Sequence, residues 1–407
     1  MSGLNFDAII VGAGPNGLAL ALALAGPQAQ PKARVLVVDA KGLTDPSRSG
    51  DTRGSAITQA TQNLLKSLGC FDAIQPPPED MRSIAVTNGT GRLDARPVLL
   101  GFATEEGRPA AAAIAENNAI LSALQTAAHA SPGICWRTPA RIAAITRSPG
   151  WVELSFTEGE PVRAPLLVGA DGRNSFIRQE AGIGVDVLAG GQSALTFSIS
   201  HSLPHHGRAE EHFTATGVIA FLPLPGNRMS LVWGTSDDEA QSLMALSDEA
   251  FAEMLTAEAG GHLGRIALSG GRQCYPLRRQ LAKSLTAPRT ALIGDAAHGI
   301  HPLAGLGLNL GFKDVAALAE CIQDAMSRGE DWGGPAVLDR YAVWRRFDII
   351  TTAHLMEAMS LLFVNDVPVL REMRQAGLRI ADRLPFFKAA LMKEAAGLSG
   401  DVPRLMR

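Results

Sequence analysis

The stretch FDAIIVGAGPNGLALALALA, residues 6–25, decides the fold of this chain. It opens with a short apolar run rich in isoleucine, which is typical of a strand buried on both faces of a parallel sheet. The alternating leucines and alanines after the glycines predict a close-packed helix, and RVLVVDA at residues 34–40 predicts a second buried strand. Strand, helix and strand in this order predict a βαβ unit.

The turn between the first strand and the helix carries Gly12, Gly14 and Gly17 in the pattern GxGxxG. Gly12 permits the tight turn, Gly14 lets the backbone approach a pyrophosphate, and Gly17 allows the helix to pack closely. Asp39 ends the second strand 22 residues after Gly17, near the offset of an acid that binds an adenosine ribose. A glycine-rich turn in an ordinary α/β sheet is the alternative. Strand, helix and acid together favour a dinucleotide site, either NAD or FAD.

Two later segments carry a similar signal. LLVGADGRNSFIR, residues 166–178, is a buried strand that ends in Asp171. RTALIGDAAHGIHPLAGLGLNLGFKD, residues 289–314, is a strand ending in Gly294 and Asp295, followed by a glycine-rich loop and a helix start. An acid at a strand end suits hydrogen bonds to polyol hydroxyls, and exposed N–H groups before a helix suit a phosphate or the polar edge of a ring. Each of these segments could be an ordinary turn at the edge of a sheet. The GxGxxG turn and the two later segments, occurring in this order, argue against that alternative.

The middle of the chain alternates between apolar and polar residues, as antiparallel strands do. The segments that predict strands are 81–88, 151–157, 194–200, 218–225 and 228–234. Apolar residues at helical spacing predict helices over 116–129 and 308–326. The length of 407 residues suggests two or three domains, and the pattern predicts two interleaved α/β domains.

The order of these motifs resembles that of the single-component FAD aromatic hydroxylases, which share the para-hydroxybenzoate hydroxylase fold. Within that group the chain resembles the ubiquinone-biosynthesis hydroxylases. The segments that carry the closer match are DTRGSAIT (51–58), AENNAILSAL (115–124), HPLAGLGLNLGFKD (301–314) and the tail at 363–406. The resemblance implies an α/β fold in which an FAD-binding, Rossmann-like domain is interleaved with a mixed or antiparallel β-sheet substrate domain, followed by C-terminal helices.

The resemblance also implies boundaries and residue roles. We expect the FAD-binding domain at 1–76, 102–180 and 275–342, the substrate domain at 77–101 and 181–274, and a helical region at 343–407. The expected contacts to the pyrophosphate and adenosine ribose are Gly12, Gly14, Gly17 and Asp39. The expected contacts to the rest of FAD are Arg53, Asp171, Gly294 and Asp295. The loop expected to line the isoalloxazine ring is Pro302, Gly305, Leu306, Gly307, Leu308 and Asn309.

Two positions depart from the family pattern. Leu306 stands where glutamine is common, and Asn118 stands where the middle helix often has arginine. His298 and His301 flank the loop, and two interpretations stay open: a general base, or histidines held by backbone hydrogen bonds. The paired histidines in LPHHGRAEEH, residues 203–212, are interpreted as part of a solvated loop, so no metal site is predicted.

The function implied by the resemblance is hydroxylation of the aromatic ring of a polyprenylated phenol in ubiquinone biosynthesis. NAD(P)H would reduce FAD, and O2 would be captured as a flavin 4a-hydroperoxide. Asp171 would serve both FAD and the nicotinamide, which has no domain of its own. The alternatives are a hydroxylase of another aromatic metabolite and a low-turnover flavin-binding subunit of a multi-protein assembly. Other ubiquinone-biosynthesis proteins are expected partners.

Charge and cysteine usage suggest where the protein works. The net charge of −3 gives no argument for nucleic-acid binding, and four widely spaced cysteines suit a reduced, cytosolic compartment. Residues 368–407 hold eight basic and four acidic side chains, so this tail carries +4 and the rest of the chain −7. Its apolar and basic composition is typical of an interfacial helix that binds the inner face of a membrane. A helix pair packed on the FAD domain or on a partner subunit is the alternative.

Overall fold

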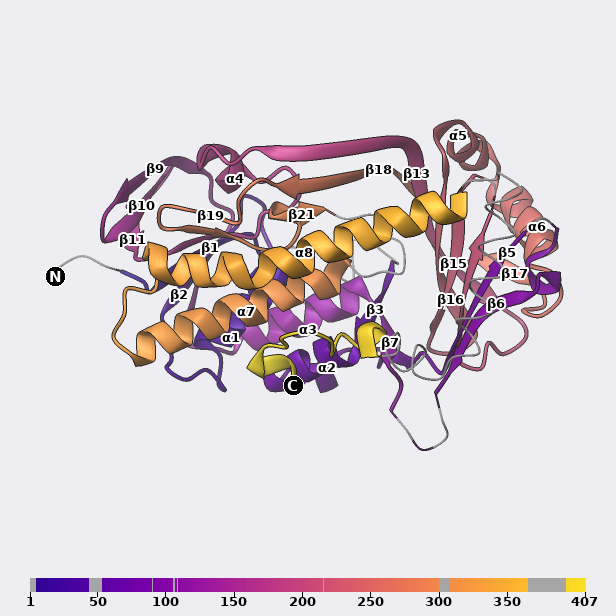
Figure 1. The fold of residues 1–407 in the computed structure, drawn as a ribbon, viewed down its shortest axis with the longest axis horizontal. Coiled ribbons are helices and arrows are strands. Elements are labelled where there is room, and N and C mark those ends of the chain that lie inside the picture. The colour runs from indigo at the N-terminus through magenta and orange to yellow at the C-terminus, as the bar shows by residue number, and fades with distance from the viewer. Residues whose placement is uncertain are drawn as a thin grey trace.

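The computed structural model describes residues 5–43, 53–89, 91–104, 107, 109–214, 216–299, 307–364 and 393–407. Figure 1 shows a Rossmann-like part at one end and a large, mostly antiparallel sheet at the other, with two long helices running between them. The exception is one parallel pair of strands in that sheet. Most of the tail that we expect to contact a membrane or a protein, residues 365–392, lies outside the described residues. In the described part of the chain, no helix is both long enough and apolar enough to cross a bilayer.

The Rossmann-like part is built on a six-stranded sheet. Its strands lie in the order β19 (Thr286–Ala287), β20 (Thr290–Leu292), β12 (Leu167–Gly169), β1 (Ala8–Val11), β2 (Val35–Val38) and β8 (Ile134–Arg137). All neighbours pair in parallel except β19 and β20. The predicted βαβ unit is therefore confirmed, with β1 at the centre of the sheet.

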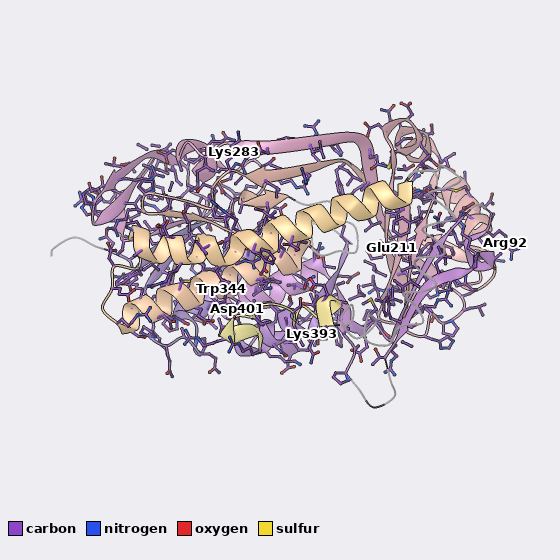
Figure 2. All side chains as sticks on the ribbon, in the orientation of Figure 1. Arg92, Glu211, Lys283, Trp344, Lys393 and Asp401 are labelled. Carbon is purple, nitrogen blue, oxygen red and sulfur yellow. The ribbon has the colours of Figure 1, made fainter. Side chains whose placement is uncertain are left out.

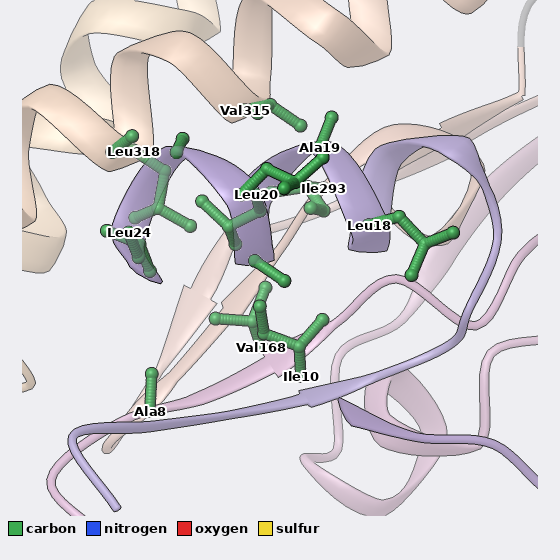
Figure 3. Close-up of a cluster of buried hydrophobic side chains, with 14 of the residues drawn as sticks. Ala8, Ile10, Leu18, Ala19, Leu20, Leu24, Val168, Ile293, Val315 and Leu318 are labelled. Atoms are coloured by element: carbon green, nitrogen blue, oxygen red, sulfur yellow. The ribbon is translucent and has the colours of Figure 1, made fainter. Parts of the chain in front are cut away.

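Helix α1 (Pro15–Ala25) is buried along its length because it lies between the sheet and two other helices. Those helices are α3 (Asn117–His129) and α7 (Gly307–Ser327), both predicted from their periodicity. Figure 3 shows the leucines of α1 packed against β1 and β12 on one side and against α7 on the other. The apolar character of α1 all round follows from this position.

Two three-stranded sheets accompany the two larger ones. The sheet β11 (Val162–Ala164), β10 (Trp151–Phe156) and β9 (Ile142–Ser148) lies at the Rossmann-like end. The sheet β3 (Gly54–Thr58), β7 (Ala112–Glu116) and β4 (Glu79–Asp80) lies between the two ends. This middle layer brings together the segments around Arg53 and Asn117.

The large sheet has nine strands. Eight follow the order β21 (His298–Gly299), β18 (Gln273–Ala282), β13 (Val185–His201), β16 (Arg228–Ser236), β15 (Val218–Leu224), β14 (Arg208–Phe213), β5 (Ser83–Asn88) and β6 (Val98–Ala103). The ninth strand, β17 (Ile266–Leu268), also pairs with β13. Helices α5 (Asp237–Ala245) and α6 (Asp248–Ala259) cover one face and bury an apolar cluster beneath them. The other face meets the middle layer.

The remaining helices are α2 (Gln59–Ser67), α4 (Phe176–Glu180) and α8 (Pro335–Val364), with short 3-10 turns at Phe71–Ala73, Leu93–Ala95, Gly294–Ala296 and Arg404–Met406. The predicted α/β fold class is confirmed, and each predicted strand is present. One interpretation is wrong in part: His205 and His206 lie outside any strand, but residues 208–212 of the expected solvated loop belong to strand β14. The proposed domain boundaries stay a prediction, because β13 and β18 run together from the Rossmann-like part into the large sheet.

Candidate functional site

Two of the three motif glycines are required by packing. Gly12 has a φ of +113°, and a Cβ there would lie 2.3 Å from the carbonyl oxygen of Ala170. A Cβ at Gly17 would lie 2.0 Å from the carbonyl oxygen of Gly12. Gly14 differs, because a Cβ there would meet nothing within 4 Å. The loop therefore leaves open space at the one glycine whose expected role is to let a ligand approach.

The N-terminus of α1 lacks a side-chain cap, because its N-cap residue is Gly14. The first N–H groups of the helix and its dipole thus face this open space, as in an anion site. Beside them, the buried Oδ1 of Asn16 has no hydrogen-bond partner among the described residues. Its side chain packs so closely on Gly294 and Gly311 that a Cβ at either would lie 2.1 Å or 2.6 Å from the Asn16 Nδ2. Asn16 is a site residue that the motif alone did not single out.

Asp39 lies beside the glycine loop, as predicted. Its carboxylate accepts hydrogen bonds from the backbone N–H of Ala13 and of Lys41, each at 2.8 Å. These bonds tie the end of β2 to the turn after β1. Part of the role of Asp39 is therefore to shape the loop, and its contact with a ribose stays a prediction.

The two other predicted acids differ in how the chain uses them. Asp171 accepts hydrogen bonds from the hydroxyl of Ser175 at 2.5 Å and the N–H of Ile177 at 3.1 Å, so it holds the start of α4. Asp295 is half exposed, and its Oδ2 lies 3.3 Å from the Nε of Arg173. Of the two, Asp295 presents the more accessible carboxylate.

The first turn of α7 is fixed through Asn309. Its buried side chain accepts hydrogen bonds from the N–H of Thr58 at 3.0 Å and the hydroxyl of Thr61 at 2.7 Å, and it donates to the carbonyl of Ala56 at 2.6 Å. Asn309 thus joins α7 to the middle layer. Gly307 and Leu308 begin the same helix. Pro302, Gly305, Leu306 and His301 lie outside the described residues.

Arg53 lies between the middle layer and the large sheet. Its guanidinium is 6.0 Å from the centre of the Tyr275 ring, and its carbonyl accepts from the N–H of Asn117 at 2.9 Å. Ser55 donates to the side chain of Asn117 at 2.6 Å, while the N–H of Gly54 donates to Ser230 of β16 at 2.8 Å. Burial raises the pKa of Tyr275, although the positive charge of Arg53 opposes this shift. Two of the four segments that carry the family resemblance, 51–58 and 115–124, therefore meet here.

His298 is buried rather than open to a ligand. Its Nε2 lies 2.5 Å from Oδ2 of Asp314, and Nε of Arg345 lies 2.8 Å from the other oxygen of that carboxylate. Burial alone would raise the pKa of Asp314, but the charges of His298 and Arg345 outweigh it and hold the pKa below its usual value. Asp314 also accepts from the N–H of Gly294 at 2.9 Å. The geometry favours a structural histidine, held by a carboxylate instead of by the backbone.

A family model described as an FAD binding domain matches residues 5–350. The chain belongs to this FAD-binding family. It is 38% identical over 405 residues to ubiquinone hydroxylase UbiL of Rhodospirillum rubrum, covering 98% of this chain and 92% of the relative. It is also 36% identical over 395 residues to 3-demethoxyubiquinol 3-hydroxylase of Escherichia coli, covering 96% and 98%.

A solved structure shows the same fold. p-Nitrophenol 4-monooxygenase of Pseudomonas putida superposes with a TM-score of 0.80 and 19% identity, covering 99% of this chain and all of that one. Together these relationships confirm the predicted family, that of the FAD-dependent monooxygenases, and FAD as its cofactor. The open space at Gly14, the uncapped α1 and the unpartnered oxygen of Asn16 fit a bound dinucleotide.

Proposed function

We propose that this protein hydroxylates the aromatic ring of a polyprenylated phenol in ubiquinone biosynthesis, with NAD(P)H as the reductant of its FAD. The observation that carries the proposal is similarity over nearly the whole length of two ubiquinone-pathway hydroxylases, at 38% and 36% identity. The similarity covers both the Rossmann-like part and the large sheet. The substrate-facing half of the molecule is therefore included.

The chain's own residues would bind and orient the cofactor. Gly12, Gly14, Gly17 and the start of α1 would hold the pyrophosphate, and Asp39 the ribose. The residues proposed to contact the rest of FAD are Arg53, Asp171, Gly294, Asp295, Gly307, Leu308 and Asn309. Bound FAD supplies the electron transfer and oxygen chemistry of the reaction. The proposed contacts at Pro302, Gly305 and Leu306 lie outside the described residues.

The large sheet would supply the wall that keeps water from the reacting ring. Its face toward the middle layer contributes Ala209, Leu222 and Leu224 to a buried apolar cluster between the two layers. The other members of this cluster are Ala56, Met81, Ala112 and Ile114. An apolar wall suits a prenylated ring, and it protects reactive species from water. Arg53 and Tyr275 lie at the boundary of the same two layers.

The experiment that tests this function is deletion of the gene, followed by identification of the quinone precursor that accumulates. We expect the accumulated precursor to lack one ring hydroxyl. The ring carbon without that hydroxyl identifies the position that the enzyme hydroxylates. In parallel, the purified protein should be yellow, and a prenylated phenol should stimulate its NAD(P)H oxidation. Normal quinone content in the deletion strain, or a protein that binds no FAD on reconstitution, would refute the proposal.

We also propose contact with the membrane through the C-terminal region, since a polyprenyl substrate partitions into lipid. Val343, Phe347 and Ile350 are 75%, 75% and 45% exposed, and their spacing puts them on one face of α8. The test is co-sedimentation with vesicles of anionic lipid. Truncation after Arg383 and the variant Phe347→Ser should both reduce it, while a folded truncate that sediments unchanged would exclude the tail.

A further inference from the structure

The two faces of the large sheet can be told apart from its pairing. Glu211 of β14 pairs with Ala220 of β15, which pairs with Val232 of β16. Paired residues point to the same side, as do residues two apart on one strand. Ser230, two residues before Val232, accepts the hydrogen bond from Gly54 of the middle layer. Glu211, which Figure 2 labels beside the large sheet, therefore lies on the face that meets the middle layer.

Glu211 is the one acid of β14 on this face, and its surroundings are apolar. Ala209 packs in the cluster with Ala56 and Ile114, and Phe213 packs with Val86 and Val218. Glu211 lies between these two positions on the strand. The opposite positions are Ala220 on β15 and Val86 on β5, so the side chains directly beside the carboxyl are small or aliphatic.

Within the part of the chain that the structure describes, the carboxyl of Glu211 makes no hydrogen bond and no ion pair. Burial raises its pKa to about 7, although the residue keeps partial contact with solvent. Two pairs of ionisable groups on the same face are engaged with each other: Arg228 lies 3.0 Å from Glu116, and Arg53 lies against Tyr275. A half-buried carboxyl in apolar surroundings costs stability when it is ionised and nothing pairs with it.

The neighbouring Glu210 shows how this chain satisfies a buried acid. It points to the opposite face, where its oxygens lie 2.9 Å from His212, 3.2 Å from His262 and 2.9 Å from Arg208. Burial alone would raise its pKa, but His212 and His262 lower it to about 2. Two adjacent glutamates thus have opposite environments. Glu210 has partners within the chain, whereas Glu211 has none among the described residues. We infer that the partner of Glu211 is a bound molecule.

We propose that Glu211 is the substrate-positioning carboxyl of this enzyme, which binds the hydroxyl group of the aromatic ring and so sets the ring carbon presented to the cofactor. The proposal rests on the proposed function, because it takes a prenylated phenol as the substrate. The apolar residues on either side of Glu211 along the strand, Ala209 and Phe213, would border the ring. No bond is made or broken in this step.

The chemistry of a phenol matches this position. A phenol hydroxyl keeps its proton near neutral pH, since its pKa is about 10, so it can donate to the carboxylate. A hydrogen bond to a charged group is stronger than one between neutral groups, and more so away from water. A ring whose hydroxyl is methylated cannot donate, and it would leave the carboxylate unpaired. A site of this type selects strongly for the hydroxyl.

The experiment compares 2-geranylphenol with its methyl ether as probes of the FAD-loaded protein. Binding is followed by the change in flavin absorbance between pH 6 and pH 9, and hydroxylated product is measured against NAD(P)H consumed. Wild type should bind the phenol about tenfold to a hundredfold more tightly than the ether. This preference should increase as the pH rises through about 7.

The variants isolate the carboxylate. Glu211→Ala should abolish the preference, and Glu211→Gln should keep part of it but lose the pH dependence, since an amide accepts hydrogen bonds without titrating. The matched control is Glu253→Gln, which removes an exposed carboxylate from α6 on the other side of the sheet. Retention of the preference and the pH profile in Glu211→Ala, or equal changes in Glu253→Gln, would overturn the assignment.

The outcome for wild type separates this proposal from the proposed function. If Glu211→Ala hydroxylates the phenol with the same selectivity and the same product as wild type, the role of Glu211 is refuted and the proposed function stands. Wild type that binds FAD but neither binds nor hydroxylates any prenylated phenol refutes the proposed function, and the role of Glu211 with it. Coupling adds an independent readout, because a misplaced ring in Glu211→Ala should consume NAD(P)H with less product.

Discussion

The glycine loop and the inner face of the large sheet are both places where a ligand is expected, but they are specified differently. In the loop, the backbone sets the geometry: Gly12 and Gly17 leave no room for a Cβ. On the sheet, the distinguishing group is one side chain, Glu211, whose direction depends on strand pairing. A backbone constraint leaves a pattern in the sequence because it restricts the residue type, whereas a side chain on a sheet face does not.

The largest effect should come from Asp314→Asn. This substitution tests whether the Rossmann-like part, which holds the glycine loop, also depends on a buried side chain. The substitution leaves Arg345 and His298 buried without their carboxylate, so we expect a loss of roughly 4 kcal/mol in the free energy of unfolding. Urea denaturation measures it. The exposed Asp339→Asn on the same helix as Arg345 should change the stability by no more than about 0.5 kcal/mol, and an equal loss there would contradict the account.

Gly17→Ala should destabilise the protein by about 3 kcal/mol. The added Cβ would meet the carbonyl oxygen of Gly12 at 2.0 Å, so either the helix or the loop has to move. The denaturation midpoint in the absence of added FAD gives the loss. Stability within experimental error of wild type would show that the loop is not set by backbone packing.

Glu211→Gln should stabilise the protein above neutral pH. The folded-state pKa of about 7 lies above the unfolded value of about 4.5, so the folded state binds the extra proton and its stability decreases as the pH rises between these values. We expect a gain of about 3 kcal/mol at pH 8 and little change at pH 4. Melting temperatures across the pH range test this. A destabilised variant at pH 8 would mean that Glu211 already has a partner within the chain.

Gly14→Ala should have the smallest effect on stability and a distinct effect on the cofactor. The residue has a φ of −77°, which alanine adopts easily, and its Cβ would meet no protein atom within 4 Å. The same Cβ would occupy the space expected for the pyrophosphate, so FAD should bind about tenfold more weakly, or about 1.4 kcal/mol. FAD affinity is measured by fluorescence titration of the apoprotein. An unchanged affinity would show that the pyrophosphate does not bind beside Gly14.

The sequence allowed the Rossmann-like part to be predicted because its constraints are local. A glycine at a positive φ, a buried strand and an apolar helix each restrict the residues along a short window. Asn16 and Arg345 were missed because their roles depend on contacts with distant segments. Part of segment 203–212 was misassigned because Glu210 and His212 look solvated, although they satisfy each other inside the protein.

The contact between Asn309 and Thr58 joins residues 251 positions apart. Ribosomes add about 5 to 20 residues per second, so the first half of the cofactor site waits roughly 10 to 50 seconds for the second half to emerge. During that interval β3 and the start of α2 lack the helix that closes over them. FAD can therefore stabilise only a nearly complete chain, and we expect the newly made protein to depend on chaperones until its last third is synthesised.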